Sequence, residues 1–180
     1  ATFWLAQFLF TEGRKEEAFA RLDSLTRKHP ENTLFLVTLS NWYSRTSNPD
    51  EALATAQKAV AINRRKKIRY GEEFAYSTLG AVYFSRNDFA RSRENFELFL
   101  ATVQNKEFIS NSIYYRLGVA QEITGDRAKA MATYALLKNI SDRDRAGDRF
   151  NYRVAQKRIT TPMTGADILI IKADNELGRK

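Results

Sequence analysis

The chain has 180 residues, of which 43% are hydrophobic and 28% charged, a balance typical of a folded domain and different from that of a disordered chain. It contains no cysteine, which excludes disulfides, zinc-thiolate sites, iron-sulfur clusters and cysteine nucleophiles. No apolar run approaches the ~18 residues of a membrane-spanning helix. The net charge of +8 favours acidic partners.

Four similar segments predict tight turns between helices. Each begins with Gly or Asn, which tolerate the left-handed backbone at a helix end, and continues with Pro or acidic residues, which favour the first turn of a helix. The segments are 13–22, 48–56, 87–92 and 125–130. Subtracting the numbers of the equivalent residues Gly13, Ser47, Asn87 and Gly125 gives spacings of 34, 40 and 38, which indicates a repeat. The two longer spacings predict extended helices or connections at 64–70 and 104–108.

Upstream of each turn, apolar residues recur at helical spacing, as in Tyr76, Leu79 and Tyr83. The spacing predicts helix pairs over 1–29, 31–63, 67–104 and 106–140. A ninth helix is expected over 142–159 and a last one over 165–177, after a break at Pro162. The apolar run 168–171 also fits a helix better than a strand. The predicted fold class is therefore all-α, built from antiparallel helix pairs.

The spacing of these apolar residues resembles that of the tetratricopeptide repeat family, in which the first helix of each repeat carries Trp, Leu-Gly and Tyr. The third unit matches at Tyr76, Leu79, Gly80 and Tyr83, with Phe96 as the aromatic residue of its second helix. The fourth unit matches at Tyr114, Leu117, Gly118, Ala130 and Tyr134, while Gln121 replaces the usual tyrosine. The resemblance implies a right-handed superhelical solenoid.

The resemblance covers residues 1–140 as four helix pairs. Residues 141–160 are expected to form a terminal or bridging helix, and residues 161–180 the first helix of a further repeat. We therefore expect the chain to be a fragment of a longer array. The start of the chain lacks an initiator Met and a basic signal region, so the sequence predicts no localisation.

In the family, the first helices of successive units line a concave groove that binds a protein partner. The matching positions here, largely apolar with a few polar anchors, are Phe3, Gln7, Phe10, Val37, Asn41, Arg45, Phe74, Phe84, Tyr115 and Val119, with Glu122 among them. Such a groove suits an amphipathic helix or an extended peptide, with Asn41 bonding to its backbone. The alternative is that several aromatics pack between repeats or under a neighbouring segment of the same parent protein, because aromatic residues at helical spacing are usually core.

Two further hypotheses stay open. In one, apolar surface pairs with a second copy or with the rest of a parent protein, which would make the chain an oligomerisation or assembly module. In the other, two basic clusters bind RNA or an anionic surface. The first cluster is Arg64, Arg65, Lys66, Lys67 and Arg69, and the second, along one face of the ninth helix, is Arg145, Arg149, Arg153 and Lys157.

The sequence offers little to a catalytic hypothesis. His29 is the only histidine, which excludes a histidine triad and a histidine metal cluster. No Gly-rich phosphate loop or dinucleotide fingerprint is present. We expect a protein-binding scaffold that is not an enzyme and that has no cofactor and no metal.

Overall fold

The computed structural model describes residues 2–46, 48–67, 72–139 and 146–177. Within these ranges the elements are helices without a strand, so the predicted all-α class is confirmed. The elements are α1 (Thr2–Thr11), α2 (Lys15–Lys28), α3 (Thr33–Arg45), α4 (Pro49–Lys66), α5 (Glu72–Ser85), α6 (Phe89–Thr102), the 3-10 turn η1 (Lys106–Phe108), α7 (Asn111–Ile123), α8 (Arg127–Tyr134), α9 (Ala146–Thr160) and α10 (Gly165–Leu177).

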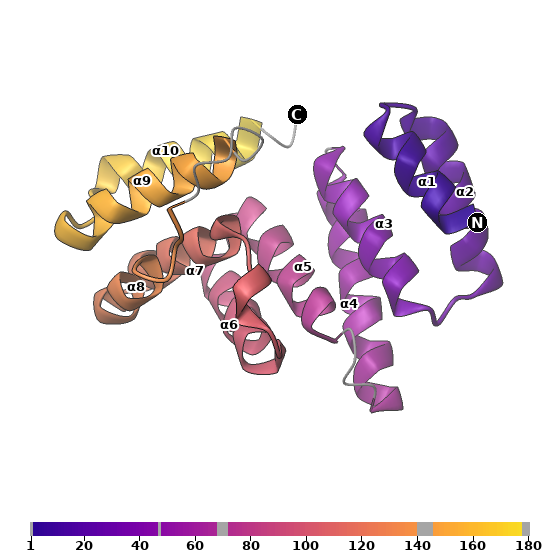
Figure 1. Cartoon of the computed structure of the whole chain (residues 1–180), viewed down its shortest axis with the longest axis horizontal. Coiled ribbons are helices and arrows are strands. Elements are labelled where there is room, and N and C mark those ends of the chain that lie inside the picture. The colour runs from indigo at the N-terminus through magenta and orange to yellow at the C-terminus, as the bar shows by residue number, and fades with distance from the viewer. Residues whose placement is uncertain (1, 47, 68–71, 140–145, 178–180) are drawn as a thin grey trace.

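Helices α1 to α8 form four antiparallel pairs that stack one on the next (Figure 1). The second helix of each pair packs on the first helix of the following one, as α4 does on α5 and α6 on α7. The array is a right-handed superhelical solenoid. Helix α9 continues the stack on α7 and α8, whereas α10 turns back and contacts α5.

Three of the four predicted turns use the left-handed backbone. Gly13, Asn87 and Gly125 have φ values of 81°, 62° and 89°. The prediction is wrong at Asn48, whose φ is −114° because it precedes Pro49 and begins α4 rather than ending α3. The acidic residues after two of the turns cap the next helix: Asp88 and Asp126 accept backbone N–H bonds of 3.1 Å from Arg91 and Lys129.

The helices within a pair approach closely where a small residue meets a large one. Gly80 in α5 faces the fully buried ring of Phe96 in α6, and a Cβ at Gly80 would lie 2.7 Å from that ring. The hydroxyl of Ser92 also donates a 2.9 Å bond to the Gly80 carbonyl. Small residues therefore set the distance between the helices, as the repeat pattern predicts.

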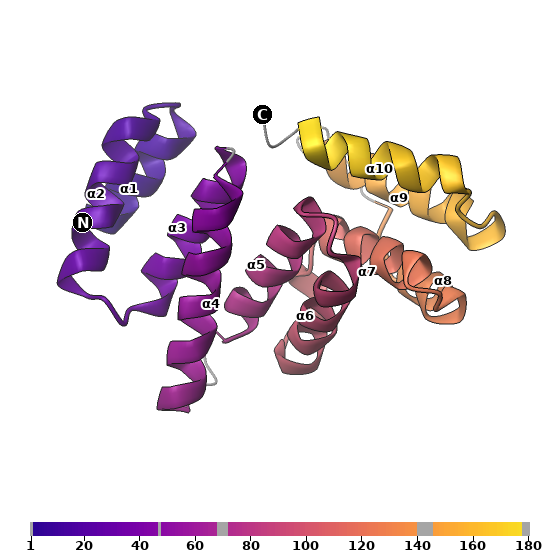
Figure 2. The same cartoon turned by 180° about the vertical axis from the view of Figure 1, so that it is seen from behind.

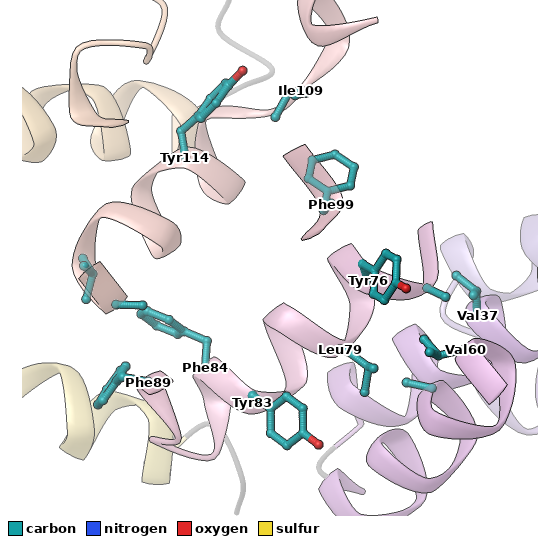
Figure 3. Packing of buried hydrophobic residues seen from close by; sticks show 14 of the residues in the cluster. Val37, Val60, Tyr76, Leu79, Tyr83, Phe84, Phe89, Phe99, Ile109 and Tyr114 are labelled. Carbon is teal, nitrogen blue, oxygen red and sulfur yellow. The ribbon is translucent and has the colours of Figure 1, made fainter. Parts of the chain in front are cut away.

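Two apolar clusters lie between the helices. One extends from α3 through α9, and Figure 3 shows part of it, including Tyr76 and Leu79. In the same cluster, the rings of Phe84 and Phe89 lie 5.4 Å apart between centroids. The other joins α1, α2 and α3, where the rings of Phe10 and Trp42 stack with centroids 4.4 Å apart. Helix α3 contributes to both clusters, so the solenoid has a continuous core.

Candidate docking surface

The ten predicted groove residues all lie on α1, α3, α5 and α7, the first helices of the four pairs. We call the face that these helices share the first-helix surface. The structure places the ten side chains in three different surroundings. Some lie between helices, some lie beneath residues 146–177, which we call the C-terminal segment, and some are open to solvent.

Phe3, Phe10 and Val37 pack between neighbouring helices. The ring centroids of Phe3 and Phe35 lie 5.1 Å apart. The ring of Phe10 stacks on Trp42, and Phe10 is only 6% exposed. Val37 is 6% exposed within the larger core cluster. These three residues correspond to the alternative expectation, that some of the aromatic and apolar positions hold the repeats together.

Phe84, Tyr115 and Val119 lie beneath the C-terminal segment. Val119 is fully buried, Phe84 is 7% exposed, and Tyr115 is half-buried. Apolar side chains of that segment pack on the same cluster: Ile159, Met163 and Ile171. Burial raises the pKa of the Tyr115 phenol. This end of the first-helix surface is thus covered by the chain itself.

The remaining four residues, Gln7, Asn41, Arg45 and Phe74, form what we call the open strip. Phe74 is 53% exposed, Asn41 and Arg45 are exposed, and Gln7 is half-buried. The Asn41 amide donates a 3.4 Å bond to the Thr78 hydroxyl, which joins α3 to α5. The Arg45 guanidinium lies 5.1 Å from the centre of the Phe10 ring. The strip therefore offers an apolar ring, two amides and a cation.

A hollow of about 840 Å³ adjoins Phe74 between the starts of α5 and α7. Its wall includes Phe99, Ile109 and Ile113 as well as the carboxylates of Glu72 and Glu73. The sequence pattern does not predict this hollow, although the longer spacing between Asn87 and Gly125 is a signal of additional residues there. The extra residues form η1 and the connection that closes one side of the hollow.

The first basic cluster is partly neutralised. Arg65 and Lys66 both form ion pairs with Glu31, with 2.5 Å between Lys66 Nζ and the carboxylate, and the two cations hold the pKa of Glu31 below its ordinary value. The Arg64 guanidinium lies 6.0 Å from the centre of the Tyr76 ring. Lys67 ends α4 with φ 52°, and Arg69 lies outside the described residues.

The second basic cluster follows α9. Arg153 and Lys157 are exposed one turn apart, Arg149 is half-buried, and Arg145 lies outside the described residues. Binding of RNA or an anionic surface by the two basic clusters stays a prediction, because its affinity would depend on how many of these cations contact phosphates.

An exposed apolar face lies on α1. Trp4 is 71% exposed and Phe8 is 58% exposed, one turn apart. With the repeat spacing of 34, Phe8 corresponds to Trp42 of α3, which is buried against Phe10 and Phe19 of the preceding pair. This face of α1 is therefore the one that a preceding helix pair covers elsewhere in the array.

Neither a metal-binding cluster nor a membrane-spanning helix occurs in the part of the chain that the structure describes. No group of three or more His, Asp or Glu side chains there is arranged to hold a metal ion. Among the same residues, no helix combines the length and the apolar character needed to cross a bilayer.

Comparison with known proteins agrees with this architecture. Models of the tetratricopeptide repeat match residues 1–32 and residues 112–142. The solved structure of MamA is similar, with a TM-score of 0.60 at 18% identity, over 96% of this chain and 93% of that one. The TPR-like repeats of a "Podosopora anserina putative kinesin light chain" give a TM-score of 0.67 at 15% identity, over 97% and 93%. No curated protein sequence matches the chain.

Proposed function

We propose that this chain, which tetratricopeptide repeat models match at residues 1–32 and 112–142, is a protein-interaction scaffold whose open strip docks an amphipathic helix of a partner protein. The observation that carries the proposal is the position of α10, which lies on the other end of the same first-helix surface. A surface whose one end accommodates a helix has the curvature and spacing to accept another beside it.

The charge of the surface indicates the chemistry of the partner. The chain carries a net charge of +8 and the open strip presents Arg45, so an acidic polar face on the docked helix would be favoured. Helix α10 has that character: three acidic residues against one lysine give it a net charge of −2. We therefore propose an acidic amphipathic helix, with its apolar side on Phe74 and its backbone or side chains bonded by Asn41.

Docking of this kind needs no reaction. The polar groups of the strip, the amides of Gln7 and Asn41 and the guanidinium of Arg45, are hydrogen-bonding groups that can bind a partner without a chemical step. We propose that the chain acts through its preformed shape, without catalysis or a cofactor.

Selection from a displayed library of helical peptides tests the proposal. We expect the enriched peptides to combine an apolar face at i, i+3, i+4 and i+7 with acidic residues opposite. A chain carrying Asn41→Ala, Arg45→Ala and Phe74→Ala should bind them at least tenfold more weakly. The matched control is Arg153→Ala with Lys157→Ala on α9. Equal binding by the open-strip variant, with unchanged helicity, would contradict the proposal.

Self-association is a second candidate, favoured by the exposed face of Trp4 and Phe8. The equivalent Trp42 is covered by a helix pair, so a helix pair of a second copy is an occupant of the right shape. Light scattering across a concentration series should show dimers or larger species for the wild type and monomers for Trp4→Ser with Phe8→Ser. A wild-type chain that stays monomeric at millimolar concentration excludes this candidate.

A further inference from the structure

Helix α10 reaches the C-terminal end of α5, and the residues just before it reach the C-terminal end of α7, so that this segment leaves the regular stack. A second helix of a fifth pair would pack only on its immediate neighbours, yet α10 reaches α5, two pairs away (Figure 2). Asn175 lies against the end of α5, and the chain just before α10 is bonded to α7 through Met163, whose backbone N–H donates a 2.7 Å bond to Glu122.

The bonds that hold α10 are concentrated at its two ends. At its start, Asp167 pairs with Arg158 of α9 at 2.7 Å and accepts the backbone N–H of Thr164 at 2.8 Å. Near its end, the Asn175 amide donates to the carbonyl of Phe84 at 2.9 Å and to the side-chain oxygen of Asn87 at 2.8 Å. Both contacts are hydrogen-bonded and polar, the kind that water can replace.

Between its two ends, α10 buries little side-chain surface. No residue of α10 is buried, and Leu169, Ile170 and Leu177 are 67%, 60% and 67% exposed. By contrast, the much shorter α8 buries Ala130, Thr133 and Tyr134. Because apolar burial provides most of the stability of a packed helix, α10 is held less firmly than the helices beneath it.

Asn87 makes the contact between α10 and the C-terminal end of α5 specific. It occupies the left-handed turn position that glycine fills at Gly13 and Gly125, so the backbone there does not require a side chain. Its amide donates to the carbonyl of Lys172 at 3.3 Å, and its oxygen accepts from Asn175. Asparagine at this turn therefore provides an anchor for a helix that a glycine could not supply.

We propose that the ends of α5 and α7, with Asn87 as anchor, are a second docking site for an acidic amphipathic helix, and that α10 occupies this site in place of a partner until it is displaced. The inference rests on the proposed function, because both sites belong to the first-helix surface. It concerns different residues, however, and the open strip stays accessible whether or not α10 is bound.

A labelled peptide of residues 161–177 is the probe, tested against the full chain. The wild type should bind it weakly, because its own α10 competes. Ile171→Pro, which breaks α10 while leaving the site intact, should bind the peptide at least tenfold more tightly. Adding Asn87→Gly, which preserves the turn and removes the anchor, should reverse that gain. Ile170→Ser, on the exposed side of α10, is the control and should behave as the wild type.

Two results of the peptide experiment would overturn the inference. One is equal binding of the peptide, or equal lack of it, by the wild type and Ile171→Pro. The other is tight binding that survives Asn87→Gly, which would place the peptide elsewhere. Hydrogen exchange of the wild type gives a second test: α10 should exchange faster than α5 and α7, and equal protection would show that it is not displaceable. Neither result depends on Asn41, Arg45 or Phe74, so the docking proposal for the open strip can fail independently.

Discussion

The ring of Tyr134 fills the space that a side chain on Gly118 would need, so a Cβ at Gly118 would clash with Cε1 of Tyr134. Tyr134 is fully buried, and its hydroxyl donates a 3.1 Å bond to Glu122, one turn beyond Gly118 on the same helix. The contact between α7 and α8 is therefore fixed by a glycine, an aromatic ring and a buried carboxylate together.

Replacing Gly118 with alanine should destabilise the fold. The ring of Tyr134 cannot move without losing its bond to Glu122, so we expect the free energy of unfolding to fall by about 1–3 kcal/mol. Urea denaturation measures the change. Gly147→Ala in α9 is the matched control, because no atom lies within 4 Å of a Cβ there and alanine is the better helix former. A loss at Gly147 equal to that at Gly118 would argue against the steric explanation.

Removing the Glu122 carboxylate should loosen the junction between α7 and the C-terminal segment. Its side chain is 6% exposed and accepts bonds from Arg127, Tyr134 and the backbone of Met163. Glu122→Ala removes the acceptor of Tyr134 and Met163, while Arg127 keeps its bonds to the carbonyls of Arg158 and Ile159, and we expect a cost of about 2–4 kcal/mol. Calorimetry gives the total loss, and hydrogen exchange should show the largest increase in α9 and α10. If exchange rises uniformly along the chain, Glu122 is not a local junction.

Acidification should release α10. The Arg158 guanidinium, then the backbone and hydroxyl of Thr164, hold the pKa of Asp167 well below its usual range. A lowered folded-state pKa means that the charged form stabilises the docked helix. That stabilisation is complete above the unfolded value near ~4, declines as the pH falls below it, and is gone only below the lowered folded-state pKa.

Backbone NMR signals of α10 between pH 6 and pH 2.5 measure this release. Asp167→Asn should weaken docking of α10 already at pH 6 and flatten the profile, whereas Asp23→Asn on α2 should leave it unchanged. A profile that is the same in the wild type and in Asp167→Asn would show that another group controls α10.

A charge in the core between the second and third pairs should unfold the array locally. Leu79 is 5% exposed among the apolar residues of the larger cluster, so Leu79→Asp would bury an unpaired carboxylate. We expect a loss of at least about 3 kcal/mol and an early unfolding transition by circular dichroism. Ala54→Asp on the exposed side of α4 is the control. Similar melting of the two variants would place Leu79 outside the core.

The sequence determined the helix pairs, because the signals for them are local. The left-handed turns at Gly13, Asn87 and Gly125 and the helical spacing of Tyr76, Leu79 and Tyr83 are read within a few residues of each other. The close approach of Gly80 to Phe96 also follows from a repeated pattern. Ten candidate groove residues could be assigned to the right helices on the same basis.

Only the tertiary structure decided which of those residues a partner can reach. Phe10, Phe74 and Phe84 are all aromatic residues on first helices. Trp42 nevertheless covers Phe10, the C-terminal segment adjoins Phe84, and Phe74 is open. The path of α10 depends on Asn175 meeting Asn87, 88 residues away. A periodic pattern specifies which face of a helix is apolar, but the covering of that face depends on contacts between residues distant in the chain, and these form only when the whole array has folded.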